Sequence, residues 1–283
     1  MRLRSLLFVP GDRPERFAKA VASGADAVIL DLEDSVAPAA KAAARTAVAA
    51  YLRERHGEAA VCVRINPLDT GLCADDLAAL AGLSPAAVVM PKAEGAESVR
   101  ALDRRLAALG IAAPILPIAT ETPAAIFQLG SYAGAGVRLA GLTWGAEDLP
   151  AAIGAAAARE ADGRYTAPYE LVRSLTLFAA HAAAVPAIET VYPALRDLAG
   201  LADYARRGAR DGFTGMMAIH PTQVAIINAA FTPDADQIAQ ARRIVAAFAA
   251  APDAGALQVD GRMVDAPHLK QARLLLDRAG ARA

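Results

Sequence analysis

Cysteine is scarce in this 283-residue sequence, which contains only Cys62 and Cys73. Their spacing matches no metal-binding motif, and two cysteines do not make a disulfide framework, so we expect two free thiols in a reducing compartment. An excess of one charge is also lacking, because 29 Lys and Arg residues stand against 30 Asp and Glu, for a net charge of -1. Nothing in this balance suggests a nucleic-acid or membrane surface, although it leaves room for a local basic pocket that binds a phosphorylated ligand.

Long uninterrupted apolar runs are missing as well. The run near the start, SLLFVP, stops at Pro10-Gly11-Asp12, too soon for the core of a signal peptide. No later run reaches the length that spans a membrane, and we therefore expect a soluble, cytoplasmic protein. Hydrophobic residues make up 55% of the chain and charged residues 21%, which favours a large buried core over disorder.

Short apolar, β-branched runs alternate with longer Ala-rich stretches along most of the chain. The runs cover residues 5–10, 26–33, 60–66, 86–92, 114–121, 137–145, 186–193 and 215–221. The stretches between them predict helices near 13–23, 38–55, 74–81, 95–109, 123–130, 149–160, 168–184 and 196–208. Continuous hydrophobicity is typical of parallel strands buried on both faces. About eight strand–helix units predict a (β/α)₈ TIM barrel over residues 1–231, with a doubly wound open sheet as the alternative.

The pattern changes after Phe231, and residues 232–283 do not form a ninth unit. Thr232 is expected to cap a helix that has Pro233 at its first position. Asp260-Gly261 predicts the turn of a short hairpin, and APHLKQARLLLDRA predicts a final helix. We expect this segment to be a C-terminal helical extension that packs as a lid over the barrel or onto a neighbouring subunit.

Polar side chains gather where the predicted strands end. The residues are Asp31, Glu33, Asp34, Arg64, Asn66, Lys92, Glu121, Glu147, Asp148, Tyr192 and His220. The carboxyl ends of barrel strands meet at one rim, which is where active sites of this fold lie. Fewer polar groups stand at the opposite strand ends, and this asymmetry is the main indication from the residues that the chain is an enzyme.

Helix capping is the alternative explanation for several of these residues. Thr122, Asp148, and Asp34 or Ser35 each stand where a helix could begin. Capping explains one polar residue in each loop. It does not explain Glu33 and Glu121, which lie before the expected caps with an arginine on the strand between them.

The polar residues suit some kinds of chemistry and not others. Glu121 and Asp148 end adjacent strands, and a hard cation such as Mg²⁺ is bound by one or two carboxylates plus water and substrate oxygens. No set of His and Cys residues fits zinc. A GxSxG elbow, a Walker loop and a dinucleotide fingerprint are all absent from the sequence.

A series of motifs spans nearly the whole chain. In order, they are LLFVPGDRPERFAKA, DAVILDLEDSV, VRINP, PKAE, ETP, GAEDL, GFTGMMAIHPTQV and GRMVDAPHLKQA. Together they resemble the citrate lyase β-subunit family, which includes malyl-CoA lyases, within the HpcH/HpaI aldolase superfamily. LDLEDSV and IHPTQV in company are highly specific. The resemblance implies a Mg²⁺-dependent barrel enzyme, with Mn²⁺ as a substitute, that makes or breaks a carbon–carbon bond next to a thioester.

The resemblance also implies roles for residues around the reacting bond. Glu121 and Asp148 match the two metal ligands. Glu33 and Asp34 match groups that order metal-bound water. Arg64 matches the cation that polarises the thioester carbonyl and stabilises the enolate, a role that suits a preorganised guanidinium.

Four further residues match positions that bind the thioester or move a proton. Phe8, Arg13 and Lys19 resemble contacts to the coenzyme A nucleotide. Asp265 resembles an acid/base that the lid of a neighbouring subunit delivers, which implies a homotrimer or a larger assembly. A turn or cap before Pro267 is the alternative for Asp265.

The expected activity is cleavage or formation of a β-hydroxyacyl-CoA, of the malyl-CoA or methylmalyl-CoA type, with glyoxylate as the second product. A citrate lyase β subunit in a multi-subunit complex and a CoA-independent aldolase for pyruvate-type substrates are the alternatives. Three residues depart from the family pattern, namely Met216, Glu189 and Ala194. These departures affect which acyl chain or carboxylic acid the protein is expected to accept.

Overall fold

The computed structural model describes residues 2–54 and 59–281. The chain forms two compact units, Met1–Asn228 and Ala229–Ala283. The boundary expected after residue 231 stays a prediction. No helix in the described ranges is long and apolar enough to cross a membrane.

Eight parallel strands form the first unit. They are β1 (Ser5–Pro10), β2 (Ala27–Asp31), β3 (Ala60–Arg64), β4 (Val88–Met90), β5 (Ile115–Pro117), β6 (Leu142–Thr143), β7 (Ala187–Glu189) and β8 (Gly215–Ala218). Their order in the sheet is β5-β4-β3-β2-β1-β8-β7-β6. Bridges from Ile115 to Leu139 and from Ile118 to Thr143 join its two end strands. The eight strands therefore form a nearly closed barrel, which confirms the predicted (β/α)₈ fold over the open sheet.

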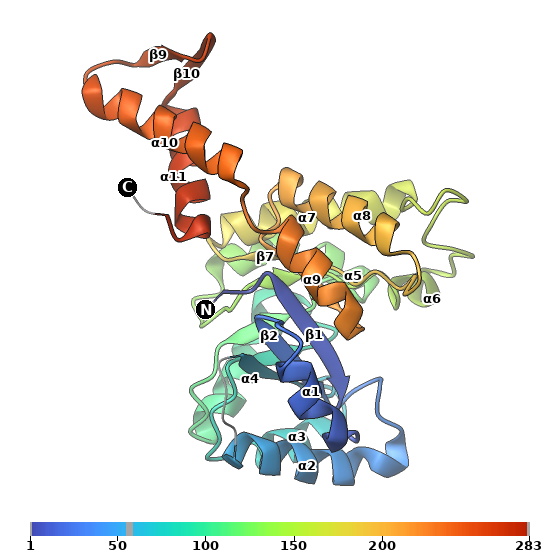
Figure 1. The fold of residues 1–283 in the computed structure, drawn as a ribbon. Helices are drawn as coiled ribbons and strands as arrows, with labels where there is room; N and C mark the ends of the chain where they lie inside the picture. The colour runs from blue at the N-terminus through green and yellow to red at the C-terminus, as the bar shows by residue number, and fades with distance from the viewer. Residues whose placement is uncertain (1, 55–58, 282–283) are drawn as a thin grey trace. The chain divides into compact units, whose positions relative to one another are not determined.

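Helical segments connect consecutive strands. They are η1 (Pro14–Arg16), α1 (Phe17–Val21), η2 (Pro38–Ala40), α2 (Lys41–Glu54), α3 (Gly71–Ala79), α4 (Gly95–Ala108), α5 (Pro123–Ile126), η3 (Leu129–Gly134), α6 (Leu149–Ile153), α7 (Ala167–Ala182) and α8 (Leu198–Asp211), and α9 (Pro221–Ala230) follows β8. Figure 1 shows β1 and β2 side by side with α1 next to them. The helix expected over 149–160 is shorter, because Gly154 ends α6 in the left-handed conformation, with φ of 69°.

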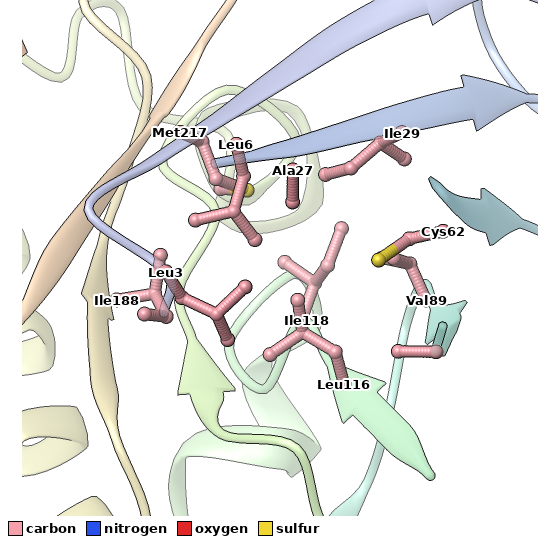
Figure 2. Close-up of a cluster of buried hydrophobic side chains, with 11 residues drawn as sticks. Leu3, Leu6, Ala27, Ile29, Cys62, Val89, Leu116, Ile118, Ile188 and Met217 are labelled. Atoms are coloured by element: carbon pink, nitrogen blue, oxygen red, sulfur yellow. The ribbon is translucent and has the colours of Figure 1, made fainter. Parts of the chain in front are cut away.

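Apolar side chains fill the inside of the barrel. Figure 2 shows this core, which contains Leu3, Leu6, Ala27, Ile29, Cys62, Ala87, Val89, Leu116, Ile118, Ile188 and Met217. Because side chains alternate along a strand, the row Ala27–Ile29 continues to Asp31, and Cys62 continues to Arg64. The rows that are apolar inside the barrel thus become charged at the carboxyl ends of the strands.

The second unit contains α10 (Ala235–Ala250), β9 (Ala256–Val259), β10 (Arg262–Asp265) and α11 (Ala266–Ala279). As expected, β9 and β10 pair antiparallel around Asp260 and Gly261, which have φ of 51° and 76°. Ala241, Ala272 and Leu276 form its apolar core.

The predicted start of the first helix in this unit is wrong. Asp234, not Thr232, caps α10. The Asp234 carboxylate accepts the Gln237 N–H at 2.7 Å, and the Gln237 side chain accepts the Asp234 N–H at 3.0 Å. This reciprocal pair satisfies two backbone donors at once, which a threonine cap two residues earlier would not do.

Candidate active site

The strand register brings Asp31 and Arg64 together. The two residues are direct partners in the pairing of β2 with β3. Arg64 donates from Nε to Asp31 Oδ1 at 2.6 Å and from Nη2 to Oδ2 at 2.7 Å. The Arg64 guanidinium carbon also lies 4.9 Å from the centre of the Phe8 ring, a distance typical of cation–π contact. The guanidinium is therefore held in one place from two sides.

Asp31 is almost completely buried and has several further donors. It accepts the N–H groups of Glu33 and Ser35 at 2.9 and 3.1 Å, and the Ser35 hydroxyl at 2.5 Å. Burial acts to raise the pKa of Asp31, but the hydrogen bonds and the charge of Arg64 outweigh it, so the pKa is lowered. Asp31 is consequently a fixed anion that anchors Arg64.

Glu33 lies between two cations. Its Oε2 is 2.8 Å from Arg64 Nη1, and its Oε1 is 2.8 Å from Lys92 Nζ. Burial raises the pKa of Glu33, and the charges of Arg64 and Lys92 only partly offset it. The buried Lys41 ammonium donates to the carbonyl oxygens of Leu32 and Glu33 at 2.8 and 2.9 Å. Lys41 thereby fixes the backbone that carries the Glu33 carboxylate.

Glu121 is buried beside other carboxylates. Its Oε2 accepts the Lys92 N–H at 2.6 Å. Burial is the main reason that the pKa of Glu121 rises to about 8, and the negative charges of Glu33 and Asp148 add to it. Space for this side chain depends on Gly145, where an added Cβ would lie 2.8 Å from Glu121 Cγ. Asp148 completes the group, with its Oδ1 3.6 Å from Lys92 Nζ.

Among the barrel residues for which helix capping was the alternative, capping accounts only for Thr122. The Thr122 hydroxyl caps α5 by accepting the Ala125 N–H at 3.2 Å. Asp148 stands at the N-cap position of α6, but its side chain makes no capping hydrogen bond. Ala37 is the N-cap residue of η2, so neither Asp34 nor Ser35 has that role.

The carboxylates Glu121 and Asp148 suit a hard divalent cation. Within the described ranges, no group of three or more His, Cys, Asp or Glu residues is placed to hold a metal. Two carboxylates match Mg²⁺ or Mn²⁺, because Mg²⁺ keeps several water or substrate ligands, whereas a closed zinc site needs about four protein ligands. A cation between them would also relieve the repulsion that contributes to the raised pKa of Glu121.

Arg13, Lys19 and Asp34 are exposed residues of the barrel unit. Arg13 Nε is 3.9 Å from Asp12 Oδ1, and Lys19 is on α1. Asp34 adds negative charge near Glu33. The three side chains are not part of the ion-pair network around Arg64, and their roles stay predictions.

Asp265 belongs to the C-terminal unit and is the N-cap residue of α11. Its Oδ1 lies 2.5 Å from His268 Nδ1, and this hydrogen bond is the main reason that the pKa of Asp265 is lowered. The capping alternative thus describes the local structure correctly. Its role as an acid/base stays a prediction.

Glu189, one of the departures from the family pattern, lies outside this network. It is fully buried and accepts hydrogen bonds from Trp144 Nε1 at 2.5 Å, from Arg173 Nε at 2.7 Å and from Tyr204 OH at 2.8 Å. Arg173 is on α7 and Tyr204 on α8, so Glu189 ties β7 to the helices around the barrel.

Sequence reasoning placed Asp31 and Lys92 at the rim but gave them no role. The structure makes Asp31 the anchor of Arg64 and Lys92 the link among Glu33, Glu121 and Asp148. The alternation Ala27–Ile29–Asp31 is a sequence signal that places the Asp31 side chain on the inner face of the strand. No local signal gives the left-handed conformation of Lys92, with φ of 49°.

Comparison with known proteins identifies similar sequences over nearly the whole chain. A model of the HpcH/HpaI aldolase/citrate lyase family matches residues 4–221. A citrate lyase subunit beta-like protein from Mycobacterium tuberculosis is 42% identical over 97% of this chain and 94% of its own. An L-malyl-CoA/beta-methylmalyl-CoA lyase from Cereibacter sphaeroides is 33% identical over 98% of this chain and 94% of its own.

The structures of relatives agree with the fold. The CitE protein from Mycobacterium tuberculosis, solved in complex with magnesium, acetoacetate and coenzyme A, has a TM-score of 0.83 and 40% sequence identity. The match covers 98% of both chains.

Proposed function

The chain belongs to the HpcH/HpaI aldolase/citrate lyase family, and from this premise we propose that it is a magnesium-dependent lyase acting on a β-hydroxyacyl-CoA. We favour a substrate of the malyl-CoA or methylmalyl-CoA type, which gives acetyl-CoA or propionyl-CoA plus glyoxylate. The malyl-CoA lyase relative and the magnesium and coenzyme A bound to the CitE relative support this choice.

The observation that carries the proposal is the position of Arg64. Asp31 accepts two of its N–H groups, Glu33 Oε2 lies 2.8 Å from its Nη1, and its central carbon lies over the Phe8 ring. A guanidinium has five N–H groups, so those that Asp31 does not accept can serve a substrate oxygen. Cleavage next to a thioester leaves an enolate, and a cation fixed before the reaction stabilises that charge without reorganising. Arg64 is the proposed enolate-stabilising residue.

Glu121 and Asp148 are the proposed magnesium ligands. A bound Mg²⁺ would act as a Lewis acid toward the oxygens of the hydroxy or keto acid. Gly145 leaves room for Glu121, and the Lys92 N–H holds its carboxylate. Glu33 and Asp34 are proposed to order water around the cation, with Glu33 held by Arg64 and Lys92.

Proton transfer and thioester binding fall to residues outside the ion-pair network. Asp265 is proposed to protonate the enolate carbon in the cleavage direction and to remove that proton in the reverse direction. Its delivery from a neighbouring subunit would require a trimer or larger assembly. Arg13 and Lys19 carry the positive charge that the phosphates of coenzyme A require, and Phe8 supplies an aromatic face beside Arg64.

A citrate lyase β subunit is the second candidate, favoured by the citrate lyase subunit beta-like relative. Such a subunit would act within a complex on a thioester of a carrier protein. A CoA-independent aldolase for pyruvate-type substrates is a third candidate, and failure to bind coenzyme A would favour it.

The test is to mix the purified protein with glyoxylate and either acetyl-CoA or propionyl-CoA, and to search by mass for a hydroxyacyl-CoA. Product is expected with Mg²⁺ but not with EDTA, and it should disappear in Arg64→Ala. Arg206→Ala is the matched control, because this arginine is an exposed residue of α8 that forms an ion pair with Asp203 on the same helix. Folded protein that gives no product from either thioester would contradict the favoured substrates and support the carrier-protein candidate.

A further inference from the structure

Lys92 touches three carboxylates that come from three other strand ends. Its N–H donates to Glu121 at 2.6 Å, and its Nζ lies 2.8 Å from Glu33 Oε1 and 3.6 Å from Asp148 Oδ1. These three carboxylates follow β2, β5 and β6, whereas Lys92 follows β4. A single residue therefore connects the two proposed metal ligands with Glu33.

The backbone conformation of Lys92 distinguishes the contribution of its N–H group from that of its side chain. Its φ of 49° is in the left-handed region, which a non-glycine residue adopts at an energetic cost. The N–H contact with Glu121 needs only the backbone, and glycine would provide it without that cost. The lysine side chain must therefore contribute something that glycine cannot, and its contacts with Glu33 and Asp148 are that contribution.

The balance of charge among the carboxylates and their cations indicates the role of the Lys92 ammonium. Asp31, Glu33, Glu121 and Asp148 carry four negative charges if all are ionised, against the two positive charges of Arg64 and Lys92. Arg64 is committed to Asp31 and Glu33. Among the residues that the structure describes, Lys92 is the cation within ion-pair distance of Asp148.

We propose that the Lys92 ammonium is a built-in counter-ion of Glu33 and Asp148, and that it competes with the divalent cation for Asp148. This inference rests on the proposed role of Glu121 and Asp148 as metal ligands. The competition makes Lys92 a positioning residue that lowers metal affinity while it keeps the metal-free carboxylates together.

The size of the effect follows from exposure. The side chains of Lys92 and Asp148 are 33% and 34% exposed, so water screens their attraction. An ion pair of this kind changes an equilibrium by about five-fold, the upper part of the range measured for exposed pairs. Removing the ammonium should therefore tighten Mg²⁺ binding by about five-fold.

The experiment is a calorimetric titration of the full chain with Mg²⁺ without substrate, repeated with Mn²⁺ and followed by electron paramagnetic resonance. Lys92→Met and Lys92→Gln remove the charge, whereas Lys92→Arg keeps it. Lys270→Met is the matched control, because it removes one positive charge from an exposed position on α11. Circular dichroism and thermal unfolding establish that each variant is folded.

Tighter binding in Lys92→Met and Lys92→Gln, with Lys92→Arg and Lys270→Met close to the wild type, would support the competition. A second expected result is a lower metal-free Tm for Lys92→Met that Mg²⁺ restores, because the unpaired carboxylates then repel one another. Unchanged or weaker Mg²⁺ binding in both neutral variants would overturn the inference and leave the proposed function standing. A wild-type protein that binds neither metal would overturn both.

Discussion

Substitution of Gly145 by alanine tests the geometry of the proposed metal site directly. The added Cβ would lie 2.8 Å from Glu121 Cγ, 3.1 Å from Glu121 Oε1 and 3.2 Å from Ile118 Cγ2. Ordinary carbon–carbon contacts begin at ~3.5 Å, so Glu121 or the strand end must move by about 0.7 Å. Glu121 is almost completely buried and has little room to move.

Such a shift exceeds what a Mg²⁺ site tolerates, because its metal–oxygen distances are about 2.1 Å and its geometry is nearly octahedral. We expect Gly145→Ala to weaken Mg²⁺ binding by at least about ten-fold, comparable to the loss of groups that orient metal ligands. Overpacking should also lower the free energy of unfolding by about 1–3 kcal/mol.

The measurements are Mg²⁺ affinity by calorimetric titration and Tm by thermal unfolding. Gly130→Ala is the matched control, because an added Cβ there has no heavy atom within 4 Å and the backbone has no positive φ. It should leave both quantities unchanged. If Gly145→Ala bound Mg²⁺ as tightly as the wild type and kept its Tm, the close approach of Gly145 to Glu121 would not position a metal ligand.

Three more predictions follow from the ion-pair network and the C-terminal unit. Asp31→Asn should lower kcat by about 100-fold, because Arg64 loses its charged anchor. Steady-state kinetics measures this change, and an unchanged far-ultraviolet circular dichroism spectrum shows that the variant is folded. A near-normal kcat would argue against Arg64 as the enolate-stabilising cation. The pKa of Glu121 rises from its ordinary value of 4.5 to about 8, so the metal-free folded state binds more protons than the unfolded state between those values. The stability of the metal-free protein should therefore fall as the pH rises through this window, which a series of Tm measurements in EDTA would show. The dependence of Tm on pH should disappear in Glu121→Gln, and also in the wild type when Mg²⁺ replaces EDTA. Asp265→Asn should keep the Tm of the wild type, because asparagine caps a helix as well as aspartate does, while kcat falls about 100-fold or more. A lower Tm with a normal kcat would show that Asp265 serves as a helix cap and not as the acid/base.

The sequence was informative where a physical rule acts on neighbouring residues. The buried strands appeared as continuous apolar runs, and Gly261 after Asp260 indicated the hairpin turn. Helix boundaries were less certain. Gly154 shortened α6, and Asp234 replaced Thr232 as a cap, because capping depends on which side chain reaches a free backbone donor.

The site itself was predictable only in part. The end-of-strand positions of four charged residues predict that their side chains lie at one rim of the barrel; these are Glu33, Arg64, Glu121 and Asp148. Their partners were not predictable, because each contact joins residues that are distant in the chain. Lys92 is the clearest example, since it is 59 residues from Glu33 and 29 from Glu121 in sequence, yet it contacts both.

The sequence by itself determined the barrel, the family and the set of charged residues at the strand ends, because periodicity and motifs are properties of short stretches of chain. Tertiary structure alone decided how those charges are paired. The register of β2 against β3 set Asp31 beside Arg64, and closure of the barrel brought Glu33, Lys92, Glu121 and Asp148 to one cluster. Burial there also raised the pKa of Glu121, since desolvation exists only once the chain has folded around the carboxylate.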